Sequence, residues 1–505
     1  MRWRCSTWGA PVSEWLNDMD YDIIICFETH VELNTATKLF CDCRVLYDAS
    51  PNSQICPVCT GQPGALPVLN KKAVEYSIRA GLALNCNINS QSRFARKNYF
   101  YPDLPKGYQI SQYERPFCED GHLEIICDDG KSKKIGIKRI HLEEDAGKLV
   151  HSSDSLEGSE FSLVDYNRSS VPLLEIVCDH EKNPMRSINE ARAYLEKLKQ
   201  TLKYIGISDC MLEKGQFRND VNVSIRPKGE KTFGNRAEIK NMSSFRFIVE
   251  ALEYEIKRQS GILDVGGKVD QETRLFDEAN KTTLPMRSKE NAPDYRYFPD
   301  PDLVEVEIDR EFISRVEKDI PELPDQKLNR IMDQFELPKN DAIILTRDKA
   351  VSDFFGACAP LCEDIRRLSN WIIKELFRLL NDASAKIEDC RVSPEDFSHL
   401  INLISKGHIT EGIGRTVLDE MFKCGKHPDS IIEKKGLKPL SDMGRLGVII
   451  DEVMAENPKV VEKISAGESK PIEFLIGQVM KKAKGKADAR KVKELIYTRL
   501  GDRLQ

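Results

Sequence analysis

The sequence predicts an α+β fold in which a cradle domain, built on a mixed or antiparallel sheet, precedes a helical domain and a small all-helical tail domain. Segments of alternating polarity separated by turns occupy residues 21–302, as expected of half-buried strands. After about residue 317, apolar residues recur at spacings of three and four, which is typical of amphipathic helices. The length of 505 residues corresponds to roughly three domains of about 150 residues each.

Changes of pattern set the expected limits of these parts. Residues 1–20 match the following sequence poorly and are expected to form an N-terminal extension, which lacks the apolar stretch of a secretory signal. We expect the cradle domain over residues 21–302, the helical domain over 303–425 and the basic tail domain over 426–505.

Helices are also predicted at particular places. Within the cradle domain, apolar spacing predicts one long helix from Ile188 to Ile205, and Gly206 ends it. In the C-terminal half, Asn370 to Leu380 and Asp442 to Val453 have the same spacing. The chain therefore changes from strand-rich to helical along its length.

Composition excludes several classes of protein. Hydrophobic residues make up 40% of the chain and charged residues 31%, which excludes wholesale disorder. The formal charge of −6 excludes nucleic-acid binding through overall positive charge. No apolar run approaches the roughly eighteen residues of a membrane span, so no membrane association is expected. The 15 scattered cysteines indicate a reducing compartment.

Positive charge is concentrated at the C-terminus. Between Met480 and Gln505 there are nine basic and three acidic residues, a net +6 that leaves −12 for the rest of the chain. An acidic body with a basic end suits a polyanion held at one place, such as a nucleic acid. A solvated helical tail explains the same charges equally well.

Four cysteines form two close pairs. Cys41 and Cys43 are separated from Cys56 and Cys59 by the twelve residues 44–55. Such short knuckles joined by a loop can place four thiolates around one ion, so the spacing predicts a structural zinc site. With four protein ligands the ion has no open position and would pin a loop. Four reduced thiols without a metal are the alternative.

Polar side chains repeat on one face of several predicted strands. The alternation predicts these groups: Glu28, His30 and Glu32; His141, Glu143 and Asp145; Glu175; and Asp220, Asn222, Ser224 and Arg226. A solvated strand face explains any one group. Acidic groups gathered on one surface, however, repel unless a cation compensates them. Oxygen-rich clusters with few imidazoles suit Mg²⁺, which also brings ATP phosphates.

A loop rich in cations and aromatic rings lies between these strands. It runs from Arg96 to Gln109 and contains Lys106, and the segment from Asp294 to Pro299 has a similar composition. Either segment could approach phosphates or an unstacked nucleotide. A surface loop packed by its own aromatic rings is the alternative. The sequence contains neither a P-loop nor the motifs of a serine amidase.

Seven motifs resemble one known family, the B subunit of the aspartyl/glutamyl-tRNA amidotransferase. They are Phe27 to Leu33 (FETHVEL), Cys56 to Pro67 (CPVCTGQPGALP), Tyr99 to Gln112 (YFYPDLPKGYQISQ), His141 to Lys148 (HLEEDAGK), Val171 to Val177 (VPLLEIV), Asp294 to Leu303 (DYRYFPDPDL) and Phe474 to Gly485 (FLIGQVMKKAKG). The resemblance extends from about Tyr21 to Leu500.

The resemblance implies an ATP-dependent ligase acting on aminoacyl-tRNA. Proteins of this family bind tRNA for Gln that carries Glu, or tRNA for Asn that carries Asp. They use ATP and Mg²⁺ to phosphorylate the side-chain carboxylate, and ammonia then displaces the phosphate. A separate amidase, the A subunit of the enzyme, supplies the ammonia, and a small C subunit completes the heterotrimer. A bacterial cytoplasm is implied, with an organellar matrix as the alternative.

The resemblance also implies roles for particular residues of this sequence. His30, Glu143 and Glu175 match the family's Mg²⁺ positions, and Glu28 matches an acidic position near the reacting centre. The other matches fall into three roles: Asp220, Glu238, Lys240 and Lys106 as lining of the cradle; Cys41, Cys43, Cys56 and Cys59 as zinc ligands; and Lys481, Lys482, Lys484, Lys486, Arg490 and Lys491 as tRNA contacts.

Three positions depart from the family's pattern, and two other functions stay open. Cys26 replaces a usual glycine, Ala95 an acid and Ser243 an amide, and none of these is a metal position. A non-catalytic tRNA-binding scaffold would use the cysteine knuckle and the basic tail without chemistry. A free-standing amidase is disfavoured by the missing nucleophile motifs. The sequence leaves open whether Glu-tRNA, Asp-tRNA or both are used.

Overall fold

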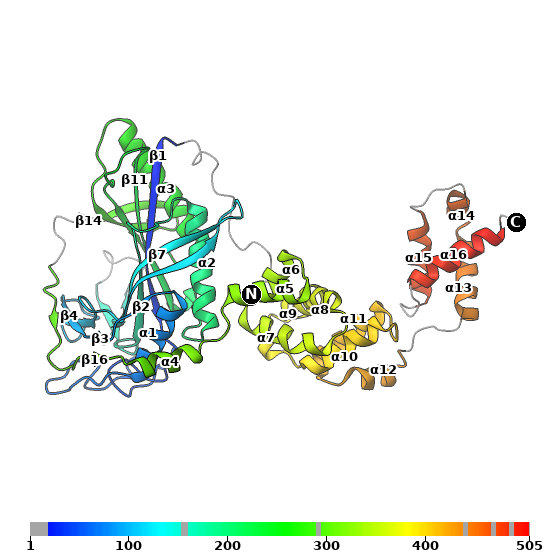
Figure 1. Ribbon diagram of the computed structural model, residues 1–505, viewed down its shortest axis with the longest axis horizontal. Helices are drawn as coiled ribbons and strands as arrows, with labels where there is room; N and C mark the ends of the chain where they lie inside the picture. The colour runs from blue at the N-terminus through cyan, green and yellow to red at the C-terminus, as the bar shows by residue number, and fades with distance from the viewer. Residues whose placement is uncertain are drawn as a thin grey trace. The chain divides into compact units, whose positions relative to one another are not determined.

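The computed structural model describes residues 19–152, 160–288, 294–437, 443–465, 471–483 and 489–503. These residues form two compact units, one ending at Leu323 and the other beginning at Pro324. The first unit contains the sheets and the second is helical (Figure 1), as the predicted α+β class requires. None of the described helices is long and apolar enough to cross a membrane.

A nine-stranded sheet organises the first unit, and its strand order is β14-β13-β12-β11-β1-β10-β7-β6-β2. All neighbouring strands pair antiparallel except β12 and β13, which are parallel. The strands are β1 Tyr21–Glu32, β2 Asn87–Ile88, β6 Cys118–Ile126, β7 Ser132–Glu144, β10 Pro172–Cys178, β11 Phe217–Pro227, β12 Ala237–Lys240, β13 Glu272–Asp277 and β14 Thr282–Ser288. The prediction of a mixed sheet is confirmed.

Three smaller sheets accompany the large one. Their orders are β15-β4-β5, β16-β3 and β8-β9. The strands are β3 Gln91–Ser92, β4 Ala95–Asn98, β5 Tyr108–Ser111, β8 Lys148–His151, β9 Ser162–Asp165, β15 Phe298–Pro299 and β16 Val306–Glu307. The loop from Arg96 to Gln109 is thus the β4–β5 hairpin. Strand β15, at the end of the segment from Asp294 to Pro299, pairs with β4.

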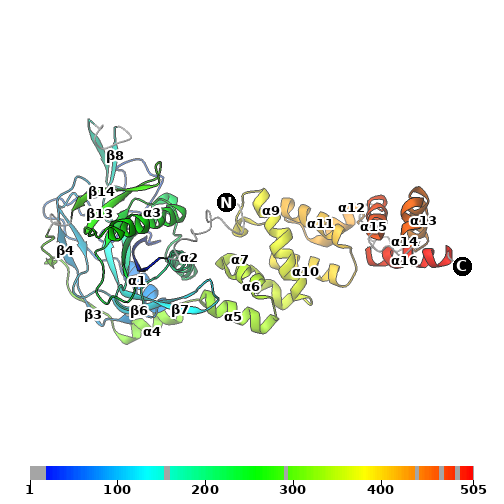
Figure 2. The same ribbon diagram turned by 90° about the horizontal axis from the view of Figure 1, so that it is seen from above.

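Helices cover one face of the large sheet, and polar side chains occupy the other. The helices of this unit are α1 Lys71–Ala83, α2 Ile188–Tyr204, η2 Leu212–Lys214, α3 Phe245–Asp264 and α4 Arg310–Lys318. In β1, Ile25, Phe27 and Val31 are fully buried on the helix side, and the Phe27 ring stacks on Tyr194 of α2. Helices α1, α2 and α3 pack against the sheet strands (Figure 2). The other face of β1 carries Glu28 and His30.

The long helix predicted from Ile188 is confirmed as α2. The Ser187 side chain caps its N-terminus by accepting a hydrogen bond from the Glu190 N–H. Gly206, with φ +71°, follows the C-terminus, as expected where the chain leaves a helix in the left-handed conformation. Leu195, Leu198 and the other apolar residues of the stripe are buried in the core of the first unit.

The second unit is built from helices with two separate apolar cores. The helices are α5 Pro324–Phe335, α6 Lys339–Thr346, α7 Lys349–Cys358, η4 Ala359–Leu361, α8 Ile365–Trp371, η5 Ile372–Leu376, α9 Phe377–Asp382, η6 Ile387–Asp389, α10 Pro394–Ser405, α11 Glu411–Cys424, α12 Pro428–Lys435, α13 Met443–Glu456, α14 Pro458–Ser465, α15 Pro471–Lys482 and α16 Ala489–Arg503. One core extends from Ile331 to Ile431 and the other from Leu446 to Leu500.

Three cores support the organisation into three folded parts, which we retain as a proposal. The structure divides the described residues after Leu323, beyond the predicted limit at residue 302. The reason is physical, because Ile308, which precedes α4, and Val316 of α4 both pack into the first core. In the same way, Ile431 of α12 belongs to the second core, although α12 lies within the predicted tail domain.

Gly136 in β7 lies at a tightly packed place in the first unit, so a substitution there tests this packing. A Cβ atom at this position would lie 2.0 Å from the carbonyl oxygen of Lys182. The Gly136 carbonyl accepts a hydrogen bond of 2.9 Å from the Asp179 N–H, which holds the two segments together. We expect Gly136→Ala to lower the free energy of unfolding by about 1–3 kcal/mol through overpacking. Differential scanning calorimetry of the full chain measures this as a lower unfolding midpoint.

Gly261→Ala in α3 is the matched control for Gly136. A Cβ at Gly261 would meet no atom within 4 Å among the described residues. Alanine is favoured over glycine in a helix, so we expect this variant to be unchanged or stabilised by about 0.5–1 kcal/mol. An unchanged midpoint for Gly136→Ala would show that the β7 segment relaxes without cost and would contradict the expectation.

Candidate active site

The register of the large sheet brings four polar residues into one row. His30 of β1 lies opposite Glu175 of β10, which lies opposite His141 of β7. On its other side, His30 lies opposite Arg218 of β11. Residues directly opposite one another point to the same face of a sheet. The row therefore gathers imidazoles, a carboxylate and a guanidinium on the face away from the helices.

The predicted metal residues lie together on this face. The ligand atoms of His30, Glu143 and Glu175 are within 4.8 Å of one another. The Nε2 atom of His30 is 3.5 Å from Oε1 of Glu143 and 3.6 Å from Oε2 of Glu175. The His30 side chain is 23% exposed, compared with 4% for Glu143. The two carboxylates thus form the buried floor of a site that is open at His30.

His141 holds the two carboxylates in place. Its Nε2 atom is 2.9 Å from Oε2 of Glu175 and 3.7 Å from Oε2 of Glu143. The Ser111 hydroxyl of β5 donates a hydrogen bond of 2.9 Å to the same Glu143 oxygen. His141 and Ser111 therefore orient the carboxylate oxygens, as partners behind metal ligands commonly do.

The electrostatics of the row favour ionised carboxylates. Burial opposes ionisation of Glu143 and Glu175, but the neighbouring imidazoles of His141 and His30 outweigh it and lower the pKa of both carboxyls. Burial would lower the pKa of His141, but the charges of Glu175 and Glu143 raise it to about 9. The pKa of Glu28 is raised, first by burial and then by the charge of Glu175.

A second polar cluster adjoins the first. Glu28 lies opposite Asp220, and the Asn222 amide donates a hydrogen bond of 3.0 Å to the Glu28 carboxylate. The Lys240 ammonium of β12 pairs with Asp220 and lies 2.8 Å from Oε1 of Glu238. The charges of these two carboxylates overcome burial and raise the pKa of Lys240. The structure thus groups Asp220, Glu238 and Lys240 beside Glu28.

The β4–β5 hairpin lies against the same face. Lys106 pairs with Glu144, which also accepts a hydrogen bond of 2.8 Å from the Ile110 N–H. Burial opposes the charge of Lys97, but Glu143 and Glu175 raise its pKa, so this ammonium adds positive charge near the carboxylates. The hairpin therefore supplies cations next to the predicted metal residues, while Lys106 itself is paired with Glu144 rather than with the carboxylates at the metal positions.

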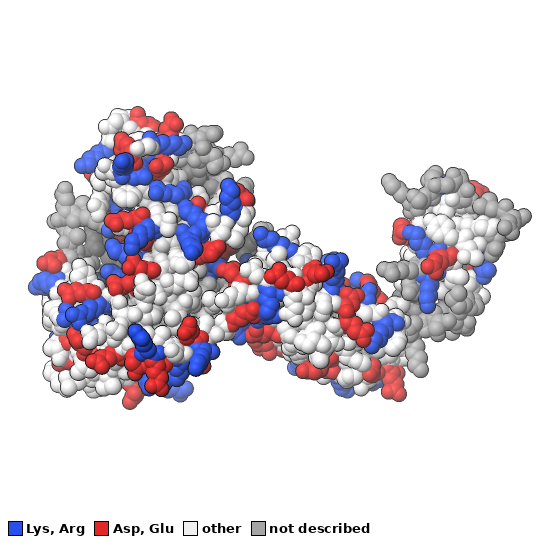
Figure 3. Space-filling model, viewed as in Figure 1, with Lys and Arg blue, Asp and Glu red and all other residues white. Residues whose placement is uncertain are grey.

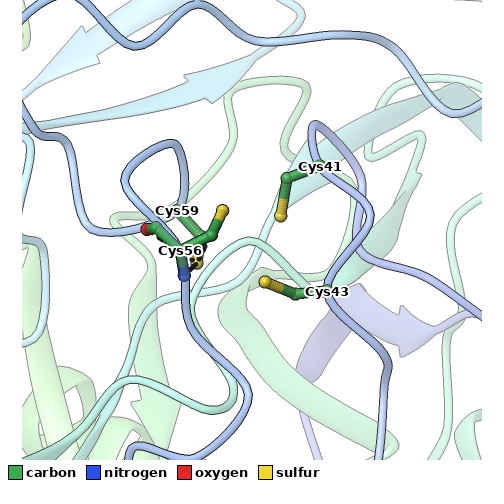
Figure 4. A group of neighbouring side chains, drawn as sticks. All are labelled: Cys41, Cys43, Cys56 and Cys59. Atoms are coloured by element: carbon green, nitrogen blue, oxygen red, sulfur yellow. Dashed lines mark hydrogen bonds between the residues drawn. The ribbon is translucent and has the colours of Figure 1, made fainter.

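The four cysteines converge in a separate place. The sulfur atoms of Cys41, Cys43, Cys56 and Cys59 lie within 4.8 Å of one another and face a common centre (Figure 4). The Sγ atoms of Cys56 and Cys59 are 3.9 Å apart. A tetrahedral zinc ion with Zn–S bonds of about 2.3 Å requires sulfur atoms about 3.8 Å apart. The Cys41 thiol, assisted by the Cys56 N–H, lowers the pKa of Cys59. The donor set and its spacing fit zinc.

The basic residues of the tail are placed only in part. Lys481 and Lys482 end α15, and Lys491 lies in α16 as an exposed residue. Lys482 forms ion pairs with Glu452 and Glu456 inside the tail. Lys484 and Lys486 lie outside the described residues, and of Arg490 only the backbone in α16 is described.

Some contacts of the site do not follow from the sequence pattern. Strand alternation places His141 on the polar face, but its contact with Glu175 depends on the pairing of β7 with β10. Asn222 likewise reaches Glu28 only because β11 pairs with β1. Within the described residues, the buried Oδ1 atom of Asn222 has no hydrogen-bond partner. A buried acceptor beside Glu28 is available to a cation or to a donor group of a substrate.

The geometry suits charge-based chemistry on an anion. Two ionised carboxylates and an imidazole can hold a divalent cation, and the cation can hold phosphate oxygens against the open side at His30. Lys97 and Lys240 add positive charge on either side. The carboxylates lie at the floor of the site and the lysines lie around it. This arrangement suits phosphoryl transfer better than metal-free hydrolysis.

Comparisons with known proteins agree with the resemblance. Two family models match, a GatB/GatE catalytic domain over residues 23–314 and a GatB domain over residues 353–500. Relatives named as the B subunit of aspartyl/glutamyl-tRNA(Asn/Gln) amidotransferase include one from Carboxydothermus hydrogenoformans, 50% identical over 481 residues, which cover 95% of this chain and 99% of that protein. Another, from Thermodesulfovibrio yellowstonii, is 51% identical over 479 residues, with the same coverage of both chains. The chain therefore belongs to the family of aspartyl/glutamyl-tRNA amidotransferase B subunits.

Proposed function

We propose that this chain is the subunit that amidates the amino acid on a mischarged tRNA. The substrates are Glu on tRNA for Gln, Asp on tRNA for Asn, or both. Membership of the family and the names of relatives about 50% identical over 95% of the chain support this function. The reaction class is a carbon–nitrogen ligase that uses ATP.

The chemistry requires activation of a carboxylate. The side-chain carboxylate of the esterified amino acid is a poor electrophile because its charge repels a nucleophile. Transfer of the γ-phosphoryl group of ATP gives an acyl phosphate and ADP. Ammonia then attacks the acyl carbon, inorganic phosphate leaves, and the proton that ammonia gives up passes to a base. Amide formation is thus driven by loss of phosphate.

Residues of the row at His30 are proposed to hold Mg²⁺. Glu143 and Glu175 offer carboxylate oxygens and His30 offers its Nε2 atom, all within 4.8 Å of one another. A bound Mg²⁺ supplies neutralising charge to the phosphoryl group in transit. His141 orients Glu175 through its 2.9 Å contact. The chain therefore contributes a preorganised anionic floor on which the phosphates of ATP can be held.

The adjoining cluster is proposed to receive the amino acid. Glu28 lies beside the row, where its carboxylate can take the proton released by ammonia. Lys240, held by Asp220 and Glu238, can attract the substrate carboxylate. Lys106 lines the cradle from the β4–β5 hairpin, held by Glu144. Each of these side chains is fixed by a partner, as a site that positions reactants requires.

The cysteine site is proposed to hold structural zinc. Cys41, Cys43, Cys56 and Cys59 would fill all four positions of a tetrahedral ion, which leaves none for a substrate. The ion would pin the loops before α1. Ser169, three residues before β10, donates a hydrogen bond of 3.1 Å to the Cys59 carbonyl. The zinc loops would thereby support the strand that carries Glu175.

Partners are proposed from the name of the relatives and from charge. That name designates a B subunit, which supports a heterotrimer in which an amidase, the A subunit, releases ammonia and a small C subunit completes the assembly. The tRNA is proposed to contact the basic residues of the tail, including Lys481 and Lys491. None of the described cysteines forms a disulfide, which supports a reducing cytoplasm.

The convergence of His30, Glu143 and Glu175 carries this proposal. To test it, the chain assembled with its partner subunits is given ATP, Mg²⁺, mischarged tRNA and ammonium chloride without glutamine. We expect ADP and phosphate to be released only when the tRNA is present, and Gln-tRNA or Asn-tRNA to form. The same assay is repeated with Glu175→Gln. If the variant complex binds the tRNA and cleaves ATP as fast as the unchanged complex, the chain would instead be a scaffold.

A further inference from the structure

Lys38 is fully buried beside the four cysteines. Lysine is almost never fully buried unless it is paired. Its ammonium donates hydrogen bonds to the Cys59 sulfur at 3.5 Å and to the Tyr166 carbonyl oxygen at 3.1 Å. A charged ammonium that loses water needs negative charge nearby. Because a carbonyl oxygen is neutral, the compensating charge must come from the sulfur.

The same residue connects the two halves of the cysteine site. The backbone N–H of Lys38 donates a hydrogen bond of 2.9 Å to the Cys43 carbonyl, which closes the turn that presents Cys41 and Cys43. Its side chain then crosses to Cys59 in the second half. The backbone of Lys38 is thus hydrogen-bonded to the Cys41–Cys43 pair, and its ammonium contacts the Cys56–Cys59 pair.

Charge explains why a cation is needed there. Four thiolates around one Zn²⁺ ion carry a net charge of −2, because each cysteine loses its proton on binding the metal. Such charge is costly where it is shielded from water, as at Cys59, the buried member of the four cysteines, unless a cation offsets it. At 3.5 Å, the Lys38 ammonium is in direct contact with one of the four sulfur atoms.

We propose that Lys38 is a positioning residue of the zinc site, where its ammonium offsets the excess negative charge of the four thiolates and fixes Cys59. This inference rests on the proposed zinc site. Lys38 also connects that site to the segment that enters β10, through Tyr166. A neighbouring contact, the Leu39 N–H to the Ser170 carbonyl at 2.8 Å, strengthens the same connection. Retention of zinc and placement of Glu175 are therefore linked through this residue.

The test measures the rate of zinc release from the full chain. A colorimetric chelator in excess removes zinc from the unchanged protein, from Lys38→Met and from Lys327→Met. Lys327 is the matched control, since it is a buried lysine at 8% exposure that pairs with Asp353 at 2.6 Å in the second unit. We expect release to be about tenfold faster or more in Lys38→Met, as for other partners behind metal ligands. Release from Lys327→Met is expected to be unchanged.

The outcomes separate the role of Lys38 from the presence of zinc. Equal release rates for Lys38→Met and the unchanged protein overturn the proposal, and so does equal acceleration in both lysine variants. Lys38→Gln, which keeps a neutral donor, repeats the measurement if the Met variant does not fold; slow release from it also overturns the proposal. A chain purified without zinc contradicts the zinc site itself, whereas a zinc-bearing chain with slow release in Lys38→Met contradicts only the inference about Lys38.

Discussion

Replacing Glu143 with Gln is expected to abolish ATP-dependent amidation while leaving tRNA binding intact. The variant keeps the size of the side chain and an oxygen that can accept from Ser111, but it removes a negative charge from the floor of the site. Loss of a metal ligand of this kind is expected to cost about 4 kcal/mol of transition-state stabilisation, roughly a thousandfold in rate. Single-turnover formation of Gln-tRNA or Asn-tRNA by the assembled complex measures the effect.

Glu124→Gln is the matched control for Glu143→Gln. Glu124 is an exposed carboxylate of β6 in the same sheet, so its replacement changes the net charge equally. We expect its activity to equal that of the unchanged protein. An unfolding midpoint equal to that of the unchanged protein in differential scanning calorimetry shows that Glu143→Gln has folded, and a tRNA dissociation constant within a few-fold of the unchanged value shows that it still binds tRNA. Full activity of a folded Glu143→Gln protein would refute the proposed role of Glu143.

Replacing Lys481 and Lys491 together with Gln is expected to weaken tRNA binding and to reduce its dependence on salt. Both lysines are exposed in the tail. Removing each phosphate contact should lower the slope of log affinity against log salt by about 0.7–0.9, and two contacts amount to roughly tenfold in affinity at about 0.15 M salt. Filter binding of the assembled complex at several salt concentrations measures both quantities.

Substitution is a sharper test of the tail than truncation. Removing α16 would expose the core of the tail, where Val492 and Ile496 are fully buried. Lys131→Gln with Lys182→Gln is the matched control, since both are exposed lysines of the first unit at 82% and 68%. The control is expected to leave the salt slope unchanged. An equal loss of affinity in both pairs would mean that net charge, rather than the tail, attracts the tRNA.

Charge on the second unit supports this choice of residues. On the face seen in Figure 3, acidic and basic side chains are interspersed over the helices from α5 to α12. Several basic residues of the tail are also paired, for example Lys493 with Glu473 at 3.1 Å and Arg499 with Asp451 at 3.2 Å. The number of basic residues in the tail therefore overstates the positive charge that a nucleic acid would meet. Exposed lysines are the positions at which a substitution tests tRNA binding.

The polar face of the sheet was predictable because strand alternation depends only on local sequence. Glu28 and His30 differ by two positions, so they share a face in any strand. The convergence of four cysteines was predictable for a similar reason, since short loops limit how far the pairs can separate. Long helices such as α2 follow from apolar spacing and a glycine at the end.

The exact groupings required tertiary structure. The contact of His141 with Glu175 depends on the register of β7 and β10, which no local pattern specifies. Lys240 reaches Asp220 because β12 pairs with β11. The burial of Lys38 is likewise set by packing, because a lysine in a sequence is by default a surface residue. Such contacts between distant segments decide which polar residues form a site.

The most direct test of the central claim locates the divalent cation. Crystals of the assembled complex grown with Mn²⁺ and a non-hydrolysable ATP analogue give an anomalous-difference map. We expect a peak within coordinating distance of His30, Glu143 and Glu175, in contact with the analogue's phosphates. The proposed site would be contradicted if the map showed the analogue and its metal bound elsewhere in the complex and no peak at these three side chains.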